Sequence, residues 1–312
     1  MTLSFVDNAR PAQSESDTFS QIRTIINEVG AAQVDLVIEG ETGAGKHTVA
    51  RKIHEVSRRS GEFVAVNCAA IPESLAESEL FGVVSGAFTG AQKSRCGYVE
   101  ASNKGTLYLD EIDSMSLTMQ AKLLRVLESR GVERLGSTHF IPVDMRVIVS
   151  TKIPLENLVE QKKFRRDLYY RLSVVKIQLP ALRARPEVIV PLFNAFVLEA
   201  CAKHKRAQIE ADEVVQHSLL CHNWPGNYRE LKASAERFVL GLMPLPESGF
   251  GQSLITVPLK ERLKRVEKVL IENSLTRHGG TIQKVVNELH IKKRTLYNRI
   301  KMLNISHSCT NQ

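Results

Sequence analysis

The stretch that decides the fold is Gly40-Glu41-Thr42-Gly43-Ala44-Gly45-Lys46-His47-Thr48. It follows a short apolar segment and opens an amphipathic one, which is the context of a phosphate-binding loop between a strand and a helix. Glycines let backbone amides approach phosphate oxygens, the start of the helix favours negative charge, and the lysine balances charge on the β and γ phosphates. A glycine-rich turn without function is the alternative, but the flanking pattern favours the phosphate loop.

Short apolar segments alternate with amphipathic ones on both sides of this loop. The expected strands span residues 34–39, 63–66, 107–110 and 143–150, and the expected helices follow Lys46 and span residues 117–129. This alternation predicts an α/β core with a mostly parallel sheet over residues 21–180. Residues 1–20 are polar and lack a periodic apolar face, so we expect a flexible leader there.

The β pattern fades after Pro180, and residues 181–242 are expected to form an all-α lid. Its last helix should start with Asn227 as N-cap and Glu230 three positions on, and should stop at Gly241. Three prolines and two glycines within residues 243–258 indicate a linker. Three amphipathic segments with a tight second turn follow in residues 259–312, which describes a helix-turn-helix domain.

The positive charge of the chain lies at its end. Residues 259–312 contain twelve Lys or Arg and four Asp or Glu, an excess that equals the net charge of +8 of the whole chain. Such an excess indicates a nucleic-acid-binding module attached to a body with another task. A solvated basic helix or a helical dimerisation bundle are the alternatives, and the polar, basic third helix favours DNA.

The periodicity of this domain separates its core from its surface. The apolar positions expected to follow the helical period are Leu263, Val266, Val269, Leu270 and Leu275, then Ile282, Val285, Val286 and Leu289, then Leu296, Ile300 and Leu303. The residues expected to meet DNA phosphates or base edges in the major groove are Lys292, Lys293, Arg294, Thr295, Asn298 and Arg299.

An apolar segment that ends in two carboxylates, Leu107-Tyr108-Leu109-Asp110-Glu111, lies downstream of the phosphate loop. Acidic strand ends are common in solvent, but a lysine in a phosphate loop upstream makes a nucleotide site the better interpretation. Carboxylates placed there can hold Mg²⁺ and orient an attacking water.

A third motif, Gly86-Ala87-Phe88-Thr89-Gly90-Ala91, lies between the other two. A loop hinged by glycines does not fold by local propensity, so an aromatic residue at its tip indicates a contact with another molecule. An ordinary turn with one buried Phe is the alternative. In this order of motifs, the hexapeptide resembles the signature of the bacterial sigma-54 activators, a branch of the AAA+ ATPases. The resemblance covers roughly residues 20 to 305.

The resemblance implies ATP and Mg²⁺ as cofactors and assigns roles at the nucleotide site. Asp110 would hold Mg²⁺, and Glu111 would polarise the attacking water. Asn67 would hydrogen-bond Glu111 and restrain it, with a strand-end capping role as the alternative. Thr151 would be the polar sensor beside the γ-phosphate.

Three arginines complete the implied site. Arg165 and Arg171 match the arginines that a neighbouring subunit supplies to phosphoryl transfer, whereas Arg166 between them is expected to be a surface charge. Arg229, in the lid, matches the second sensor. The resemblance therefore implies a ring, hexameric in the family, made of this chain alone or with a paralogue.

The chain departs from the family pattern at three places. His47 stands where the family commonly has Glu and where other phosphate loops have Ser or Thr, which puts the metal's ligands in doubt. Lys152 stands where the family usually has Asn. Val83-Val84-Ser85 replaces a charged stretch before the hexapeptide.

The resemblance implies an activator that binds upstream double-stranded DNA and remodels sigma-54 RNA polymerase holoenzyme through residues 86–91. In the absence of a receiver domain, the chain also resembles the short HrpS-like activators of type III secretion genes. That resemblance implies control by a separate regulatory protein. Two other classes stay open: a passive DNA-binding regulator with a decayed ATPase, and an AAA+ replication or remodelling factor.

Composition excludes some classes of site. No segment is a secretion signal or a membrane span, so we expect a cytoplasmic protein without a membrane partner. The five cysteines lack framework spacing and indicate reduced thiols. A zinc set of Cys201, His204, His217 and Cys221 can be drawn, but the spacing matches no common finger.

Overall fold

The computed structural model describes residues 17–87, 93–245, 259–303 and 305. The chain divides into two compact units, Ile22–Pro180 on the one hand and Met1–Gln21 with Ala181–Gln312 on the other. Helix α1, Asp17–Ala32, begins inside the expected leader, so that expectation is wrong for residues 17–20. Ile26 and Val29 on this helix pack against the sheet, and their burial explains why the segment is ordered as a helix.

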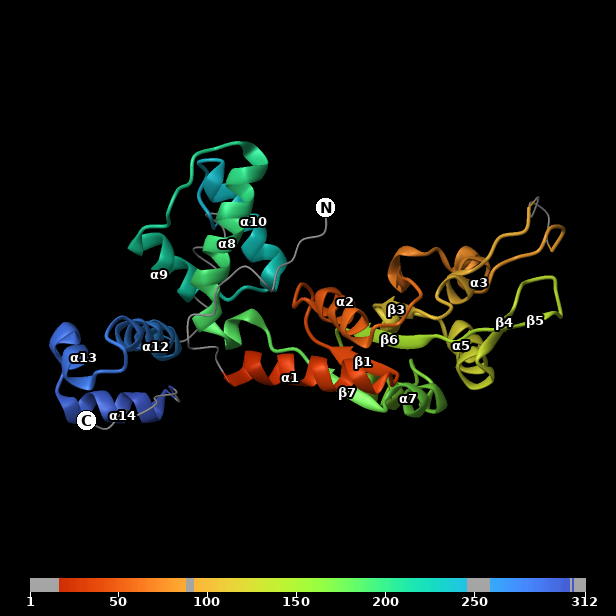
Figure 1. Ribbon diagram of the computed structural model, residues 1–312, viewed down its shortest axis with the longest axis horizontal. Coiled ribbons are helices and arrows are strands. Elements are labelled where there is room, and N and C mark those ends of the chain that lie inside the picture. The colour runs from red at the N-terminus through yellow and green to blue at the C-terminus, as the bar shows by residue number, and fades with distance from the viewer. Residues whose placement is uncertain (1–16, 88–92, 246–258, 304, 306–312) are drawn as a thin grey trace. The chain divides into compact units, whose positions relative to one another are not determined.

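The first unit is built on a parallel five-stranded sheet of order β2-β3-β6-β1-β7 (Figure 1). The strands are β1 (Leu36–Glu39), β2 (Phe63–Asn67), β3 (Thr106–Asp110), β6 (Arg146–Thr151) and β7 (Val175–Gln178). The helices are α2 (Lys46–Ser57), α3 (Glu73–Phe81), α4 (Tyr98–Ala101), α5 (Leu117–Ser129), α6 (Leu155–Glu160) and α7 (Arg166–Leu172), with short 3-10 helices η1 (Cys68–Ala70) and η2 (Ile112–Ser114).

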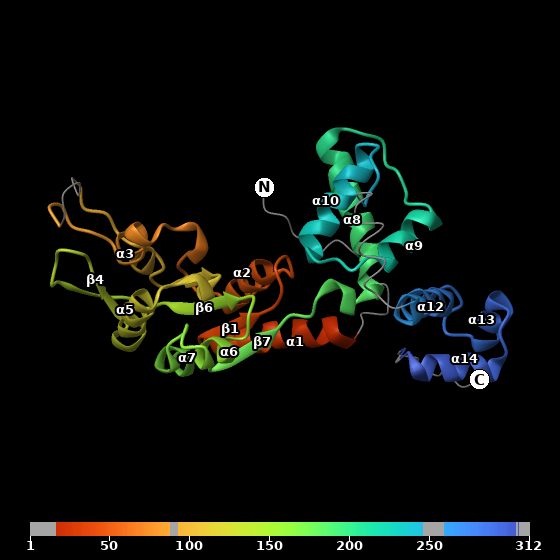
Figure 2. The same cartoon turned by 180° about the vertical axis from the view of Figure 1, so that it is seen from behind.

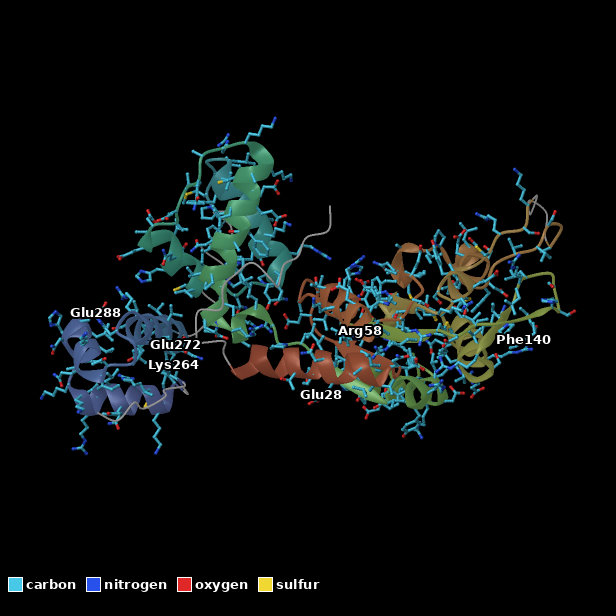
Figure 3. All side chains as sticks on the ribbon, in the orientation of Figure 1. Glu28, Arg58, Phe140, Lys264, Glu272 and Glu288 are labelled. Atoms are coloured by element: carbon cyan, nitrogen blue, oxygen red, sulfur yellow. The ribbon has the colours of Figure 1, made fainter. Side chains whose placement is uncertain are left out.

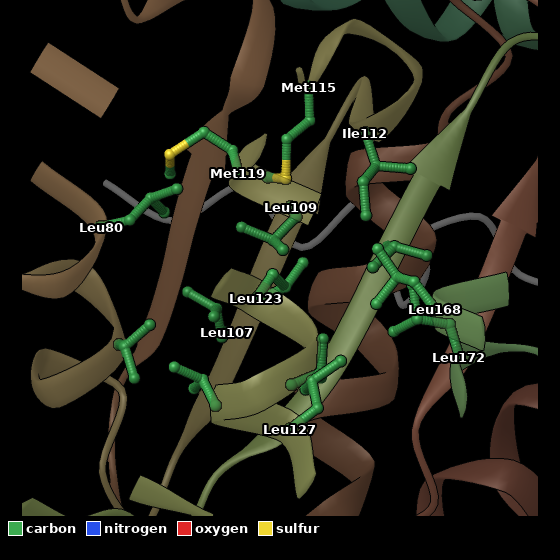
Figure 4. Close-up of a cluster of buried hydrophobic side chains, with 14 of the residues drawn as sticks. Leu80, Leu107, Leu109, Ile112, Met115, Met119, Leu123, Leu127, Leu168 and Leu172 are labelled. Atoms are coloured by element: carbon green, nitrogen blue, oxygen red, sulfur yellow. The ribbon is translucent and has the colours of Figure 1, made fainter. Parts of the chain in front are cut away.

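Helices cover both faces of this sheet, as the alternation of segments predicts. On one face, Leu107, Leu109 and Val147 pack against helix α5 and its neighbours (Figure 4). On the other face, Leu36, Tyr108 and Ile148 pack with Ala50 and Ile53 of α2. Because successive strand residues point to opposite faces, both layers are apolar, and the central strands β1, β3 and β6 are buried almost throughout.

Two features of the first unit were not expected. Strand β7 lies at the sheet edge beside β1, and its alternating polar residues hid it in the sequence. A short antiparallel pair, β4 (Gly131–Glu133) and β5 (Phe140–Pro142), follows α5. Figure 2 shows β1, β6 and β7 from behind.

The parallel order brings three strand ends to one edge. β1, β3 and β6 are adjacent, with Glu39 opposite Thr151 in the register. The phosphate loop follows β1, the acidic pair begins at the last residue of β3, and Thr151 is the last residue of β6, so the topology places the three motifs side by side.

The second unit contains the lid helices α8 (Pro186–His204), α9 (Glu213–Cys221) and α10 (Asn227–Val239), preceded by η3 (Leu182–Ala184). Gly226, not Asn227, is the N-cap of α10. The side chain of Asn227 is buried and accepts a hydrogen bond from the Leu182 amide at 2.7 Å, while Glu230 accepts one from the Gly226 amide at 2.8 Å. Glu230 therefore performs its capping role, whereas Asn227 ties the lid to its entry segment.

The end of α10 agrees with the expectation. Gly241 adopts φ +82° after the C-cap Leu240, and the amides of Gly241 and Leu242 donate back to Phe238 and Arg237.

The C-terminal helices are α12 (Leu259–Arg277), α13 (Ile282–Leu289) and α14 (Lys293–Met302). Leu296 and Ile300 are buried with Ile271, Leu275 and Val285, as expected for a helix-turn-helix core. Glu288 of α13, labelled in Figure 3, pairs with Arg277 and His278 and accepts a hydrogen bond from Ser274 of α12.

The apolar residues of helix α12 face two different hydrophobic clusters. Val266 and Val269 belong to the hydrophobic cluster of the lid, whereas Leu263 and Leu270 are exposed. The five apolar residues that follow the helical period in this segment therefore do not share one environment. One helix contributes to two cores because its length allows different turns to face different neighbours.

Two inferences from the sequence concern a membrane span and a zinc site. Among the helices in the described ranges, none combines the length and hydropathy that a bilayer crossing requires. Within the same ranges, no group of three or more His, Cys, Asp or Glu side chains is placed to hold a metal ion. His204 instead lies 2.9 Å from Glu236, and the Cys201 thiol is buried and donates to the Ala207 carbonyl.

Candidate functional site

The phosphate loop connects β1 to α2 in the conformation that its glycines allow. Gly43 and Gly45 adopt φ of 76° and 90°, a region that other residues enter only at a cost. The Gly40 amide donates to the Thr151 carbonyl at 3.2 Å, which fixes the loop to the neighbouring strand end. The amides of the loop and of the first turn of α2 are therefore gathered at one place, as an anion site requires.

Lys46 is held within the loop. Its Nζ donates to the carbonyls of Gly40 at 2.6 Å and Glu41 at 3.0 Å, and the residue is buried. Burial lowers the pKa of Lys46, while the carboxylates of Asp110, Glu111 and Asp113 oppose that shift. A triphosphate would replace the two carbonyls as partner of the ammonium group and compensate its lost hydration.

Asp110 is the most strongly held carboxylate of the site. Its Oδ1 accepts from the Tyr108 hydroxyl at 3.0 Å, from the Glu111 amide at 3.2 Å and from the Ser150 hydroxyl. These three hydrogen bonds from described residues all end on the same oxygen. The other oxygen, Oδ2, suits a hard cation such as Mg²⁺, which prefers oxygen ligands and keeps several waters.

The next residue, Glu111, has an unusual backbone. It adopts φ 53° and ψ 49°, the left-handed region, which costs a non-glycine residue on the order of 1 kcal/mol or more. Its amide points at Asp110 and Ser150, with Ser150 Oγ at 3.3 Å. This turn directs the Glu111 side chain away from the continuing strand direction, and 31% of the side chain stays exposed.

A lysine lies against this carboxylate. Lys152 Nζ is 4.0 Å from Glu111 Oε2 and 3.6 Å from Asp113 Oδ2. The site thus contains three carboxylates and two ammonium groups at the same edge of the sheet.

His47 packs against aromatic side chains. Its ring meets those of Phe63 and Tyr108 edge-on, with centroids 5.7 and 5.4 Å apart. Partial burial there lowers the pKa of His47, with Arg51 acting in the same direction and Asp110 against it. A neutral imidazole is a poorer Mg²⁺ ligand than an oxygen, so Thr48, exposed on the next position, is the better hydroxyl candidate.

The stem of the hexapeptide loop is paired with the β4–β5 hairpin. Val83 exchanges backbone hydrogen bonds with Arg95 at 3.0 and 2.8 Å, and the Val84 amide donates to Leu135 at 3.0 Å. Val83 is buried, so the apolar residues before the hexapeptide are stem residues. Gly86 and Ala87 are described, whereas Phe88, Thr89, Gly90 and Ala91 lie outside the described residues.

Helix α14, the third helix of the C-terminal domain, carries the basic residues that are expected to meet DNA. Lys292 is its N-cap, and Lys292, Lys293, Arg294, Thr295 and Asn298 are all exposed. Arg299 differs, because its Nε lies 3.1 Å from Glu267 of α12.

Known protein families match this chain in the same order as its motifs. Models of three families match: the sigma-54 interaction domain over residues 12–178, an AAA+ ATPase lid domain over 183–242, and the Fis family of bacterial regulatory proteins over 262–303. The chain is 54% identical over 292 residues to the pathogenicity locus regulatory protein WtsA of Pantoea stewartii, covering 93% of this chain and 90% of the relative.

Two further comparisons agree with these matches. The regulatory protein HrpS of Pseudomonas savastanoi pv. phaseolicola is 53% identical, with 90% of this chain and 93% of the relative covered. The crystal structure of NtrX from Brucella abortus in complex with ATP matches with a TM-score of 0.70 and 34% identity, over 93% of this chain and 68% of that chain.

The chain belongs to the sigma-54-dependent transcriptional activators. The expected fold is confirmed: an AAA+ core with a parallel sheet, a helical lid and a Fis-type helix-turn-helix domain. The sigma-54 activation domain is an AAA+ ATPase, and the match of structures with ATP and ADP supports nucleotide binding by this core.

The structure shows the hydrogen-bond partners of several expected site residues of this activator. Asn67 Oδ1 accepts a hydrogen bond from the Ala69 amide at 2.9 Å, which is the capping alternative. The Thr151 hydroxyl is buried and bonds to Ile153, at 2.6 Å to its carbonyl and 3.2 Å to its amide. Besides the Tyr108 hydroxyl, the Ser150 hydroxyl also reaches Asp110, and Ser150 was not among the expected site residues. Its place beside Asp110 on the adjacent parallel strand was the available signal.

The two expected trans-acting arginines separate. Arg165 is exposed and pairs with Asp167 at 2.6 Å. Arg171 instead reaches the buried Asp35 at 3.1 Å and the Leu127 carbonyl at 3.1 Å, so it is already engaged within its own subunit. Arg166 is exposed, as is Arg229 on α10 in the other unit.

Proposed function

We propose that this activator binds upstream DNA through α14, assembles into a hexameric ring, and uses ATP hydrolysis to convert sigma-54 RNA polymerase holoenzyme from the closed to the open complex. The observation that carries the proposal is the convergence of Lys46, Asp110 and Glu111 at one sheet edge, in the same unit as the stem in which Val83 pairs with Arg95. The nucleotide site and the stem before and after the hexapeptide then lie in one compact unit.

The residues of the site divide the chemistry between them. The loop amides of residues 40–45 and Lys46 bind and orient the triphosphate, and Thr48 and Asp110 hold Mg²⁺, which neutralises phosphate charge when bound. Glu111 orients and activates water, because it is exposed enough to meet a water molecule. Ser150 and Tyr108 fix Asp110 through hydrogen bonds.

Assembly completes the site. Arg165 is the stronger candidate for a guanidinium supplied to the neighbouring subunit, because among the described residues its guanidinium pairs only with the exposed Asp167. Such a residue contributes on the order of 10³-fold or more to phosphoryl transfer. Arg229 of the lid would report the γ-phosphate to the second unit.

The names of two relatives support a proposal for the genes that this chain activates. WtsA and HrpS are regulators of pathogenicity loci. We propose that this chain activates genes of a type III secretion locus, alone or with a paralogue in the ring, under the control of a separate regulatory protein.

The proposal is tested by transcription with purified sigma-54 holoenzyme, an upstream site and ATP. Phe88→Ala should abolish open-complex formation while ATP turnover stays within about twofold, because residue 88 is proposed to contact polymerase. Glu111→Ala should abolish both, because it removes the water-activating carboxylate.

Three outcomes would contradict the proposal. They are equal activation with a nonhydrolysable triphosphate, activation of a holoenzyme with the housekeeping sigma factor, or a wild-type chain that binds DNA without any phosphate release at high protein concentration. The last result would favour a passive DNA-binding regulator.

A further inference from the structure

Lys152 is the second ammonium group of the nucleotide site. It directly follows Thr151, the last residue of β6, and the Thr151 carbonyl accepts the hydrogen bond of the Gly40 amide in the phosphate loop. It is therefore only one residue from the point where the loop is fixed. Lys152 is also close enough to Lys46 to contribute to lowering the pKa of Lys46.

Its partners are two carboxylates. Nζ lies 3.6 Å from Asp113 Oδ2 and 4.0 Å from Glu111 Oε2. The Asp113 side chain is only 5% exposed, and its Oδ1 has no hydrogen-bond partner among the described residues. A buried carboxylate with an unsatisfied oxygen needs a nearby cation, so Asp113 holds Lys152 in place.

The contact is weak enough to be exchanged. Both distances exceed those of a direct charge-assisted hydrogen bond, and 43% of the Lys152 side chain is exposed. Lysine is a compact charge on a flexible stem, so Nζ can move to a stronger anion without any change in the backbone. A terminal phosphate bound by the neighbouring loop is such an anion, and it carries more charge than either carboxylate.

We propose that Lys152 is a positioning residue that restrains Glu111 together with Asp113 in the nucleotide-free protein and moves to the terminal phosphate of ATP, which frees Glu111 for its water. This inference rests on the proposed role of Glu111. It assigns to an ion pair the restraint that the sequence analysis expected of Asn67, whose Oδ1 caps η1.

The proposal makes Lys152 selective for triphosphates over diphosphates. The full chain is titrated, with MgCl₂ present, with ADP and with the nonhydrolysable analogue adenylyl imidodiphosphate. Lys152→Met should weaken binding of the analogue about tenfold and leave ADP binding within about twofold, since a hydrogen bond between two charged groups is lost. Lys152→Arg, which keeps the charge, should retain most of the selectivity.

A coupling measurement separates this role from a structural one. Asp113→Asn removes the competing charge, so it should tighten binding of the analogue about threefold in the wild-type background and have no effect in the Lys152→Met background. Lys122→Met is the matched control, because Lys122 is 41% exposed and paired with Glu77. It should change neither affinity.

Two results would overturn the proposal. One is an equal effect of Lys152→Met on both nucleotides. The other is an Asp113→Asn effect of the same size in both backgrounds, measured in variants whose nucleotide-free melting temperatures show that they are folded. Because the readout is equilibrium binding without polymerase or turnover, it can fail or hold independently of the transcription assay.

Discussion

At the scale of single residues, Asp110 is held by two hydroxyl groups, one from its own strand and one from the adjacent strand. Tyr108 lies two residues before Asp110 on the same face of β3, and Ser150 lies on the adjacent strand. Burial, with the Asp110 charge acting in the same direction, raises the pKa of the Tyr108 hydroxyl, so this hydroxyl remains a proton donor to Asp110.

The two arginines of helix α7 lead to a prediction at the same scale. Arg171→Ala should lower the free energy of unfolding by about 2 kcal/mol, because the buried Asp35 would keep only Arg130, at 2.8 Å, as its cationic partner. Arg165→Ala should leave the melting temperature unchanged, since its ion pair is exposed, and should abolish ATP turnover even at high protein concentration.

Thermal unfolding followed by far-ultraviolet circular dichroism checks the stability, and phosphate release checks the turnover. Tryptophan fluorescence would not serve, because the single Trp224 lies in the lid. Equal loss of stability in both variants would contradict the assignment of Arg171 to an internal ion pair.

At the scale of elements, the last turn of α2 is joined to β3 through a histidine. His54 Nδ1 lies 2.9 Å from Thr106 Oγ1. Burial lowers the pKa of His54 below its ordinary value of 6.5, and nearby arginines act in the same direction against Glu55. The neutral ring therefore belongs to the folded state.

This shift predicts a pH dependence of stability. The unfolded chain protonates His54 at a higher pH than the folded chain does. The contribution of His54 is therefore complete above pH 6.5 and is lost as the pH falls through its lowered folded pKa. His54→Gln should show a smaller decrease of the urea midpoint between pH 7 and pH 5 than the wild type. His139→Gln, at an exposed position, should keep the wild-type dependence, and a His54 variant that does so too would refute the prediction.

At the scale of the whole molecule, the chain joins an ATPase to a DNA-binding domain whose charge is concentrated in one helix. Lys292, Lys293 and Arg294 form no ion pair among the described residues, whereas Arg299 pairs with Glu267. Of these four residues, the first three are free to displace counterions from DNA phosphates.

The salt dependence of DNA binding tests this difference. Lys293→Ala and Arg294→Ala should each reduce the slope of log K against log salt by about one. Arg299→Ala should change the slope less and should lower the melting temperature, because it breaks a contact between α12 and α14. Equal slopes for Arg299→Ala and Lys293→Ala, measured by fluorescence anisotropy, would contradict the assignment.

The sequence by itself determined the α/β core, the phosphate loop, the acidic pair and the basic third helix. These follow from local patterns: glycine positions, strand periodicity and charge runs act over a few residues. It also pointed to the family through the order of three motifs.

Only the tertiary structure decided which side chains meet. Ser150 beside Asp110, Lys152 beside Glu111, Arg171 on Asp35 and Arg299 on Glu267 are pairs between residues far apart in sequence. The same arginine is a free cation or half of an ion pair depending on whether a distant carboxylate folds against it. Sequence spacing does not encode that choice, because it depends on strand order and helix packing.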